Sequence, residues 1–550
     1  MNRKIKILYA IVWVAAVISG CTKGFEELNN DPNRIPLGGL EPANMIEAIL
    51  MTGSNSLASQ MTYYATEIAQ VSSKSGNVRE EQAYLIDDGN YLTLWTTLYR
   101  WATNAVHMSQ LAAAQNDPNY EAIGLIMKVY YLAQCTDLFG SIAYTEALNA
   151  LEQIYKPRIE SQQEVYTEMM ADLERANSII DLMKTFSKAE RDHVYKGDMS
   201  HWKKFANTLH LRLLMRVSGR NDAFSPTVAQ RIKTIIDDPV TYPVFTSNAD
   251  NASVKCSASA TYYRNNYNTV DIPSQNQFDE RLSIPFLNLT VYNFETGDCD
   301  PRLRIWGKPR LANNYRWRGA IPAGSKDLGS LYGSLYSQRH WETLVRDDNP
   351  NMMMDYAELL FIKSEAAFQG WISGNAKDYY EAAVTASCQR WNELGKFASF
   401  PNQSGITASV NITSSDIAAM LAKPLTMYDG TLERIQTQKW VSLFWVIGFE
   451  MFHEMRRTGY PDMPLGTRIF SNNRTNGRFI ERFGYPQVAI NNNNANYREA
   501  ILDQKGSADN MSTMVLPVWW SGQAIARDNG NPWPHSFRTP PRRYEEDIYD

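Results

Sequence analysis

The chain has 550 residues, enough for about three domains of ordinary size or for one large helical domain. Its formal net charge is −5, and it becomes −8 once the first 20 residues are set aside, because these carry three cations and no acid. An acidic chain does not offer the broad basic face that phosphate backbones require, which argues against a nucleic-acid-binding protein. Beyond Ile18 no run of 18 uninterrupted apolar residues occurs, so the sequence gives no signal for a membrane-spanning helix.

The N-terminus has the layout of a bacterial lipoprotein signal. Three cations in the first six residues precede the twelve apolar residues Ile7–Ile18, a run shorter than the about 20 apolar residues of a spanning helix. The tetrapeptide ISGC at residues 18–21 then matches the lipobox. We therefore predict removal of residues 1–20 and attachment of lipid to Cys21. Two or three acyl chains at Cys21 would anchor the protein durably to a membrane. The alternative is an ordinary cleaved signal that happens to end at a cysteine.

The first predicted helical pair follows in residues 91–138. Apolar residues recur at steps of three and four through residues 91–114, which predicts a helix with one apolar face. Asp117-Pro118 ends this helix, and a second is predicted over Tyr120–Leu138, with Gly140 beyond its end. The two segments therefore form a predicted helical hairpin.

Later segments repeat this pattern. One of them, Asp355–Trp371, is apolar nearly all round, as a fully buried helix is. Arg456 and Arg457 stand at the C-terminal end of the last segment, and we interpret them as structural because cations suit a helix C-terminus. The further predicted helices are Gln163–Met183, Ser200–Val217 with Ser200 as its N-cap, Asp355–Trp371, Lys377–Leu394 and Thr431–Arg456.

The predicted fold class is mainly α. About four helical pairs suggest a tetratricopeptide-like scaffold with long loop-rich and short-strand insertions, although no strict repeat of about 34 residues is present. The loop-rich stretches abound in Asn, Gly, Pro and Tyr. We expect a single domain over residues 21–550, with the scaffold mainly in 45–218 and 355–460 and the loop-rich regions in 219–350 and 461–550.

Six segments, in this order, resemble the recurring blocks of the SusD/RagB family of outer-membrane lipoproteins. The resemblance is closest to the second, SusD-like branch and extends from Cys21 almost to the C-terminus. The segments are TDLFGSIAYTEAL (136–148), SQQEVYTEMMADLERA (161–176), YKGDMSHWKKFANTLHLRLLMRVS (195–218), DYAELLFIKSEAAFQGW (355–371), IQTQKWVSLFWVIGFEMFHEMRRTGYP (435–461) and LPVWW (516–520).

This resemblance implies a lipoprotein on the outer membrane, built on four tetratricopeptide-like units and facing the cell exterior. Members of the family capture nutrient oligomers without turning them over, and they close over a SusC-like TonB-dependent transporter. Lys23, Glu26 and Glu27 loosely resemble the acidic export signal of such surface lipoproteins, with a different spacing. The resemblance places the ligand face on the loops of residues 219–350.

The window Pro301–Trp341 is the main candidate ligand site. It carries eight Lys or Arg and one acid, together with aromatic residues that do not follow a helical periodicity. Sugar rings stack on aromatic faces, and their hydroxyls pair with side chains such as Asn and Arg. The alternative is that the tryptophans form the core of a small strand layer and the arginines pair with acids. If the basic window is exposed, an acidic glycan is favoured. The candidates are Trp306, Asn313, Asn314, Tyr315, Trp317, Arg318, Tyr332, Tyr336 and Trp341.

A second candidate segment is the polar stretch of residues 72–91, which the resemblance places near the ligand face. Arg79, Tyr84 and Tyr91 could complete the pocket. Tyr91 could equally be the first buried residue of its helix.

Enzyme, metal and redox signatures do not occur in the sequence. It has no GxSxG, HExxH, P-loop or GxGxxG motif, and its seven histidines are scattered. We expect no catalytic residue, no metal and no cofactor. Cysteines never form a CxxC pair, although Cys256 and Cys299 could join in an exported protein.

Three functions remain open. The first is capture of oligosaccharides for a SusC-like transporter. The second is the same scaffold capturing peptides or another nutrient, and the third is a helical-repeat surface protein that mediates only protein contacts. Exposed Trp and Tyr planes favour sugars, whereas backbone-matching edges and small apolar pockets favour peptides.

Overall fold

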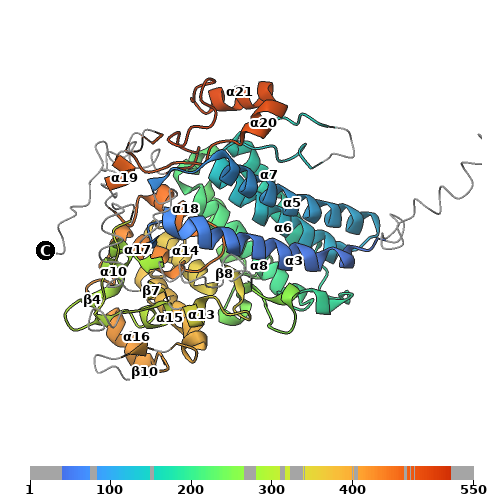
Figure 1. Ribbon diagram of the computed structural model, residues 1–550. Coiled ribbons are helices and arrows are strands. Elements are labelled where there is room, and N and C mark those ends of the chain that lie inside the picture. Colours follow the sequence, from blue (N-terminus) through green and yellow to red (C-terminus); the bar gives the residue numbers. More distant parts are fainter. Residues whose placement is uncertain are drawn as a thin grey trace, which may run out of the picture.

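The fold is mainly helical, as the sequence predicts, with a few short strands (Figure 1). In the described part of the chain, no helix has both the length and the apolar character to cross a bilayer. The computed structural model describes residues 40–74, 83–148, 154–265, 280–309, 316–322, 338–339, 341–398, 400–401, 407–463, 467–470, 472, 474–475 and 477–521.

The N-terminal half is a stack of long helices, coloured blue to green in Figure 1. From α5 to α9, each helix packs against the next in the chain. The interface of α5 and α6 is tight, since a Cβ on Gly124 would lie 2.7 Å from the carbonyl oxygen of Ala105. The helices are α3 (Ile46–Gln60), α4 (Thr66–Ile68), α5 (Asp88–Ala114), α6 (Pro118–Phe139), α7 (Gln162–Ile179), α8 (Met199–Arg216) and α9 (Val228–Asp237).

Capping residues set the ends of these helices. Gly140 ends α6 with a φ of 86°, and a Cβ there would lie 2.5 Å from Oε1 of Gln504. A left-handed residue in such a tight space has to be glycine. The prediction that Ser200 caps α8 is wrong: the N-cap is Asp198, whose Oδ1 accepts the backbone N–H of Ser200 at 2.9 Å. A carboxylate is favoured at a helix N-terminus because it also meets the positive end of the helix dipole.

The C-terminal half adds a second hairpin and a broken helix. The prediction of one helix over Thr431–Arg456 is wrong, because a bend separates α17 from α18. In this bend Trp445 has a φ of 64° and Gly448 a φ of 98°, and neither conformation continues a right-handed helix. The elements are α14 (Tyr356–Phe368), α15 (Ala376–Gly395), α16 (Ser414–Leu421), α17 (Leu432–Ser442) and α18 (Glu450–Thr458).

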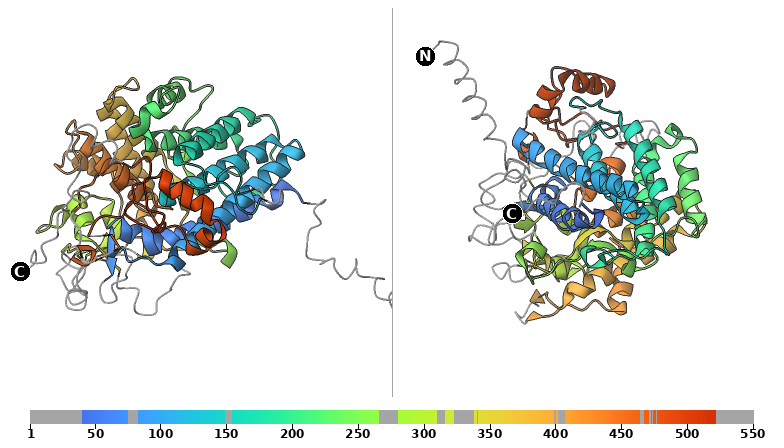
Figure 2. Two further views of the ribbon diagram at one scale, coloured as in Figure 1. Left: turned by 90° about the horizontal axis from the view of Figure 1, so that it is seen from above. Right: turned by 90° about the vertical axis from the view of Figure 1, so that its right-hand side faces the viewer.

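Helices also occur in the two regions that the sequence marks as loop-rich. The helix α9 lies in the first of these, and α20 and α21 lie in the second. Figure 2 shows α20 and α21 on the outside of the N-terminal helices, where α20 contacts α5. The remaining short helices are α10 (Ile284–Thr290), α11 (Leu303–Trp306), α13 (Trp341–Leu344), α19 (Thr467–Phe470), α20 (Gln487–Asn492) and α21 (Asn494–Asp503).

The strands are short and antiparallel. One four-stranded sheet has the order β1-β3-β7-β6, and three two-stranded ladders pair β2 with β8, β4 with β5, and β9 with β10. The strands are β1 (Ser72–Lys74), β2 (Ala252–Val254), β3 (Glu280–Leu282), β4 (Val291–Asn293), β5 (Asp298–Cys299), β6 (Gly307–Lys308), β7 (Gln338–Arg339), β8 (Asn351–Met354), β9 (Phe400–Pro401) and β10 (Thr407–Ala408).

A continuous hydrophobic core runs from Ala43 to Trp520. Inside it, the helices α6, α8, α14, α17 and α18 meet at a network of buried ion pairs. They include Arg212–Glu358 at 2.5 Å, Arg216–Glu454 and Arg457–Glu365 at 2.7 Å, Arg457–Glu454 at 2.8 Å, Lys439–Glu454 at 3.0 Å, Arg216–Asp137 at 3.3 Å, Arg212–Glu450 at 3.7 Å and Arg216–Glu450.

The two neighbouring arginines of α18 are structural, as interpreted from the sequence, but the reason differs. Arg457 belongs to the buried ion network, and Arg456 donates to the backbone carbonyls of Glu481 at 2.6 Å and Asp137 at 2.7 Å. Both side chains are buried. They therefore tie α18 to distant parts of the core, in addition to lying at a helix C-terminus.

Candidate functional site

The four-stranded sheet brings the two predicted ligand segments together. Strand β1 comes from the segment 72–91, and β6 and β7 come from the window 301–341. Strand β3 joins them, pairing Ser72 with Leu282 on one side and Arg281 with Gln338 on the other. From the sequence, only the family resemblance placed both segments near one ligand face. In the structure, the two segments are joined as strands of one sheet.

Tyr84 and Tyr91 are buried at this site. Tyr84 packs edge-on against Phe479 with ring centroids 5.5 Å apart, and burial raises the pKa of its hydroxyl. Tyr91 packs against Phe483 at 5.7 Å in the first turn of α5. The alternative interpretation of Tyr91 as the first buried residue of its helix therefore holds, and neither ring presents a face to a ligand in this structure.

Trp306 and Trp317 are also core residues, with exposed fractions of 0% and 3%. The ring centroid of Trp306 lies 4.8 Å from that of Phe444 and 5.5 Å from that of Trp391. Burying such large apolar rings contributes much of the stability of a core. The prediction of these two tryptophans as ligand-binding residues is therefore wrong. They are core residues, as the alternative has it, but Trp306 packs against α15 and the bend after α17 rather than within a strand layer.

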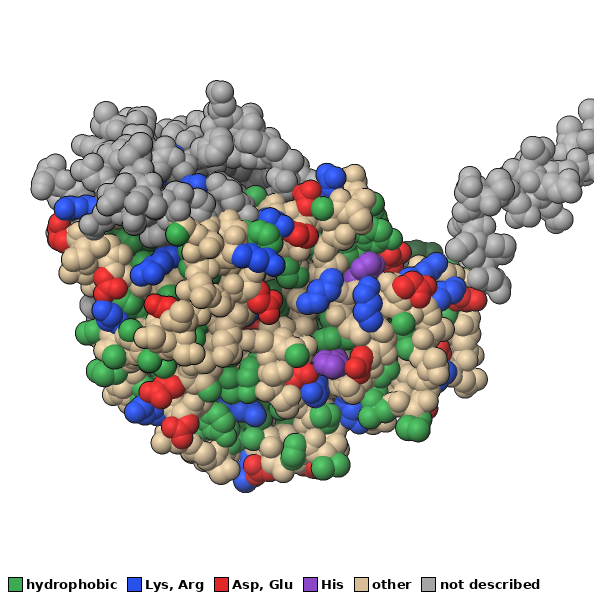
Figure 3. Space-filling model, turned by 90° about the horizontal axis from the view of Figure 1, so that it is seen from below, with side chains coloured by type: hydrophobic (Ala, Val, Ile, Leu, Met, Phe, Trp, Pro, Cys, Tyr) green, Lys and Arg blue, Asp and Glu red, His purple; other side chains and the backbone are tan. Residues whose placement is uncertain are grey.

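Part of the predicted basic charge is neutralised locally. Arg302 is buried and donates to Asp300 at 2.7 Å, while Arg316 pairs with Glu295 at 2.8 Å on the surface. The acids precede the window in the chain, so a count restricted to the window overstated the local charge. Figure 3 shows a face on which acidic and basic side chains are interspersed, with no large field of one sign. The described side chains on this face therefore form no basic field that would favour an acidic ligand.

Arg318 is half-buried and has an interaction partner in the protein. Trp341 begins α13, but its side chain is outside the described part of the structure. Six further predicted residues lie wholly outside the described ranges: Arg79, Asn313, Asn314, Tyr315, Tyr332 and Tyr336.

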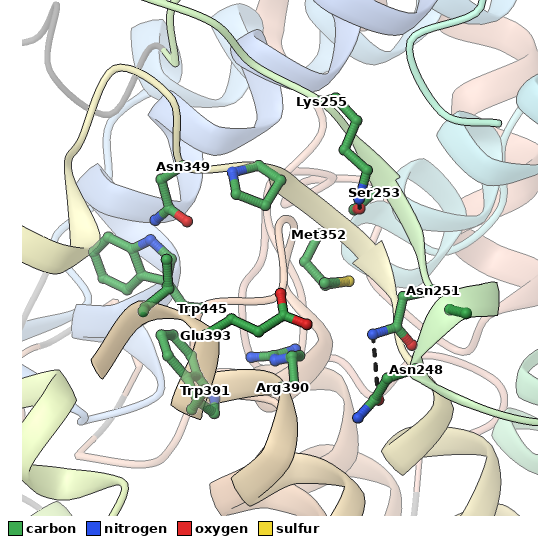
Figure 4. Close-up of a pocket in the computed structure, with 13 residues that line it drawn as sticks. Asn248, Asn251, Ser253, Lys255, Asn349, Met352, Arg390, Trp391, Glu393 and Trp445 are labelled. Carbon is green, nitrogen blue, oxygen red and sulfur yellow. Dashed lines mark hydrogen bonds between the residues drawn. The ribbon is translucent and has the colours of Figure 1, made fainter. Parts of the chain in front are cut away.

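A cavity of about 270 Å³ opens elsewhere in the fold (Figure 4). It lies between the short helix Asn248–Asp250, the ladder of β2 and β8, the last turns of α15 and the bend between α17 and α18. Its lining residues are Asn248, Ala249, Asn251, Ser253, Lys255, Asn349, Pro350, Met352, Arg390, Trp391, Glu393, Leu394 and Trp445.

Hydrogen bonds fix one wall of this cavity. Asn251 accepts the backbone N–H of Tyr356 at 2.7 Å and donates to Oδ1 of Asn248 at 3.3 Å. Asn248 in turn donates to the carbonyl of Ala386 at 2.9 Å. The two amides are thereby bonded to α14, to α15 and to each other.

The opposite wall is aromatic. Trp391 and Trp445 are nearly fully buried, and Trp391 packs against the core residue Trp306. The bend that carries Trp445 is tied to the cavity floor by a hydrogen bond from the N–H of Ile447 to the carbonyl of Met352, 2.8 Å long. A left-handed tryptophan is a strained conformation that persists because surrounding contacts impose it.

Sequence reasoning missed this cavity. Two of its three asparagines lie in the stretch TSNADNAS, which has no period, and its tryptophans lie at helical spacing that predicts core. The one available signal was the density of asparagine beside strand β2. Pattern alone does not show that this loop faces α15, because the bonded residues Asn248 and Ala386 are 138 residues apart in the chain.

The comparisons with known proteins agree with this architecture. A SusD-like family model, described as starch-binding and associating with the outer membrane, matches residues 34–486. The chain belongs to this SusD-like family. No curated protein matches it.

Solved structures share the fold of this SusD-like protein. A SusD homologue from Bacteroides fragilis is 23% identical with a TM-score of 0.71, covering 88% of this chain and 100% of that chain. A chitin-binding protein is 25% identical with a TM-score of 0.70, covering 87% and 99%. A SusD homologue from Bacteroides thetaiotaomicron is 21% identical with a TM-score of 0.65, covering 88% and 99%. The predicted family and the predicted fold class are thereby confirmed.

Proposed function

We propose that this SusD-like protein captures oligosaccharides at the cell surface and delivers them to a SusC-like TonB-dependent transporter, without catalysing a reaction on them. The family match over residues 34–486, with its description as starch-binding, is the observation that carries this proposal. The chitin-binding relative supports a carbohydrate ligand as well.

The proposed ligand face is the four-stranded sheet and the chain segments that continue from it. Strands β1, β3, β6 and β7 supply a support on which both predicted ligand segments converge. Because Trp306, Trp317, Tyr84 and Tyr91 are core, ligand contact on this face falls to the other predicted residues, among them Arg79, Tyr315 and Tyr332. These positions remain predictions.

A glycan array followed by titration tests the ligand class. We expect a Tyr315→Ala and a Tyr332→Ala variant to weaken glycan binding, since stacking on one aromatic ring contributes on the order of 1 kcal/mol. Tyr155→Ala is the matched control, because Tyr155 is 79% exposed and belongs to neither predicted segment. If the protein binds no glycan across a broad panel but binds peptides, the proposed ligand class changes from carbohydrate to peptide.

The anchor and the partner need separate tests. Lipid attachment at Cys21 predicts a mature N-terminal peptide that carries acyl chains and a Cys21→Ala variant released from the membrane. Surface exposure predicts digestion by a protease added to intact cells. Co-purification of the transporter with the native protein tests the partnership, for which a stable contact buries more than about 1,200 Å².

A further inference from the structure

The cavity beside α15 is lined by one acidic side chain, Glu393, which is exposed to solvent. Glu393 has no hydrogen bond or ion pair within the described part of the chain, and Figure 4 shows its carboxylate in the middle of the cavity. It stands in the last turn of α15, which ends at Gly395. An acid at a helix C-terminus meets the negative end of the helix dipole, so a cation bound beside Glu393 would be stabilised at this position.

The two neighbouring cations of the protein, Arg390 and Lys255, form no ion pair with Glu393. Arg390 is engaged by Asp355 at 2.5 Å and by the carbonyl of Phe444 at 3.1 Å. Lys255 stands on the other side of the cavity and donates to Oγ of Ser253 at 2.8 Å. Desolvation lowers the pKa of Lys255, and the attraction of Glu393 opposes this change. The two charges therefore face each other across the cavity without forming an ion pair.

A second acceptor joins the carboxylate. Asn349 is buried, and its amide nitrogen donates a hydrogen bond to the carbonyl of Leu344 at 2.8 Å. Figure 4 shows its amide oxygen on the cavity side. The space between these groups is floored by the apolar side chains of Pro350 and Met352. The cavity thus offers two oxygen acceptors, one ammonium donor and a small apolar floor.

From this arrangement we infer that the cavity binds a small ligand through a primary ammonium group, with that group on Glu393 and Asn349 and a neighbouring hydroxyl or carboxylate on Lys255. A single carboxylate is too few for a calcium ion, which takes six to eight oxygen ligands, and the described residues contain no cluster of three metal-ligating side chains. A volume of about 270 Å³ suits one amino sugar or one amino acid, since pockets for larger ligands start at roughly 300 Å³.

The two sources of the ammonium group are separated by matched ligands. Glucosamine is compared with glucose, which lacks the amine, and with N-acetylglucosamine, in which the amine is uncharged. L-alanine is compared with N-acetyl-L-alanine. Binding to the mature protein is measured by calorimetry at pH 7 and low salt. Binding of glucosamine alone identifies an amino-sugar site, binding of alanine alone identifies an amino-acid site, and binding of both identifies a site for the shared ammonium.

Variants test the assigned residues. Glu393→Gln keeps the shape and removes the charge, and we expect about tenfold weaker binding of the ammonium ligand. Glu499→Gln is the matched control, an exposed acid on α21 outside the cavity lining. Ala249→Trp fills the cavity from an exposed position, so it blocks binding without disturbing the core.

Three results would overturn the inference: no binding of either amine, equal binding of the uncharged analogues, or unchanged binding by the Glu393→Gln variant. The inference does not depend on the proposed function. Loss of polymer binding in Tyr315→Ala and loss of amine binding in Glu393→Gln are independent readouts, because the cavity lining shares no residue with the four-stranded sheet.

Discussion

Replacing Glu454 by Gln tests whether the buried ion network holds the helices together. Its carboxylate lies within 3.0 Å of three cations, Arg216, Lys439 and Arg457, and all four side chains are buried. Burial alone would raise the pKa of Glu454, but Arg457, Lys439 and Arg216 outweigh it and hold that pKa well below its ordinary range. At neutral pH the carboxylate is therefore a fixed negative charge at the centre of the network.

The magnitude follows from which cation is left unpaired. After the substitution Arg457 keeps Glu365 at 2.7 Å, and Arg216 keeps its pairs with Asp137 and Glu450. Lys439 has no other carboxylate within ion-pair distance among the described residues. Removing one partner of a buried pair costs about 3 to 5 kcal/mol, because the remaining charge is uncompensated. That is a large part of a total stability of about 5 to 15 kcal/mol.

The assay is urea unfolding followed by tryptophan fluorescence. The double variant Glu454→Gln/Lys439→Met removes the unpaired ammonium as well, so we expect it to regain at least about 1.5 kcal/mol over the single variant. Glu499→Gln makes the same charge change on the surface and should alter the free energy of unfolding by less than about 0.5 kcal/mol. A Glu454→Gln variant within about 1 kcal/mol of the parent would refute the reasoning.

Three further outcomes are expected. Burial raises the pKa of the free thiols of Cys256 and Cys299 to about 12 and about 11. Alkylation of both thiols at pH 8 should therefore be slow in the native protein and complete after unfolding without reductant. A peptide that contains a Cys256–Cys299 disulfide would contradict this expectation. Burial also lowers the pKa of His210 to about 3. As the pH falls, the unfolded chain therefore binds the proton before the folded protein does, and the free energy of unfolding should fall by about 2 kcal/mol from pH 7 to pH 5. The His210→Asn variant removes this pH dependence if His210 is its source. Gly124→Ala would put a Cβ 2.7 Å from the carbonyl oxygen of Ala105 and should destabilise the protein by about 1 to 3 kcal/mol in thermal unfolding; unchanged stability would show that α5 and α6 separate at no cost.

Most of the helical scaffold could be predicted because its signals are local. The helix predicted over residues 91–114 is observed as Asp88–Ala114, and the one predicted over Lys377–Leu394 as Ala376–Gly395. Periodic apolar residues and a breaker such as Pro118 are read within one or two turns of the chain. Trp445 shows where this fails, because the same periodicity continues through a bend that contacts with β8 impose.

The candidate site could be predicted only in part, because burial is not a local property. Trp306 and Trp317 stand in a loop-rich, basic stretch, and nothing in their neighbourhood along the chain distinguishes a stacking ring from a core ring. The partners that bury Trp306, namely Trp391 and Phe444, lie 85 and 138 residues further along. The same holds for Glu393, whose lack of a partner is visible only once every neighbour in space is known.

The sequence by itself determined the family and the helical pairs, and it predicts an export signal, since each of these depends on residues close together in the chain. Tertiary structure alone decided which aromatic rings are exposed, which charges are neutralised and where a cavity opens. These properties depend on distances between residues far apart in the chain, and packing sets those distances only when the whole core has formed.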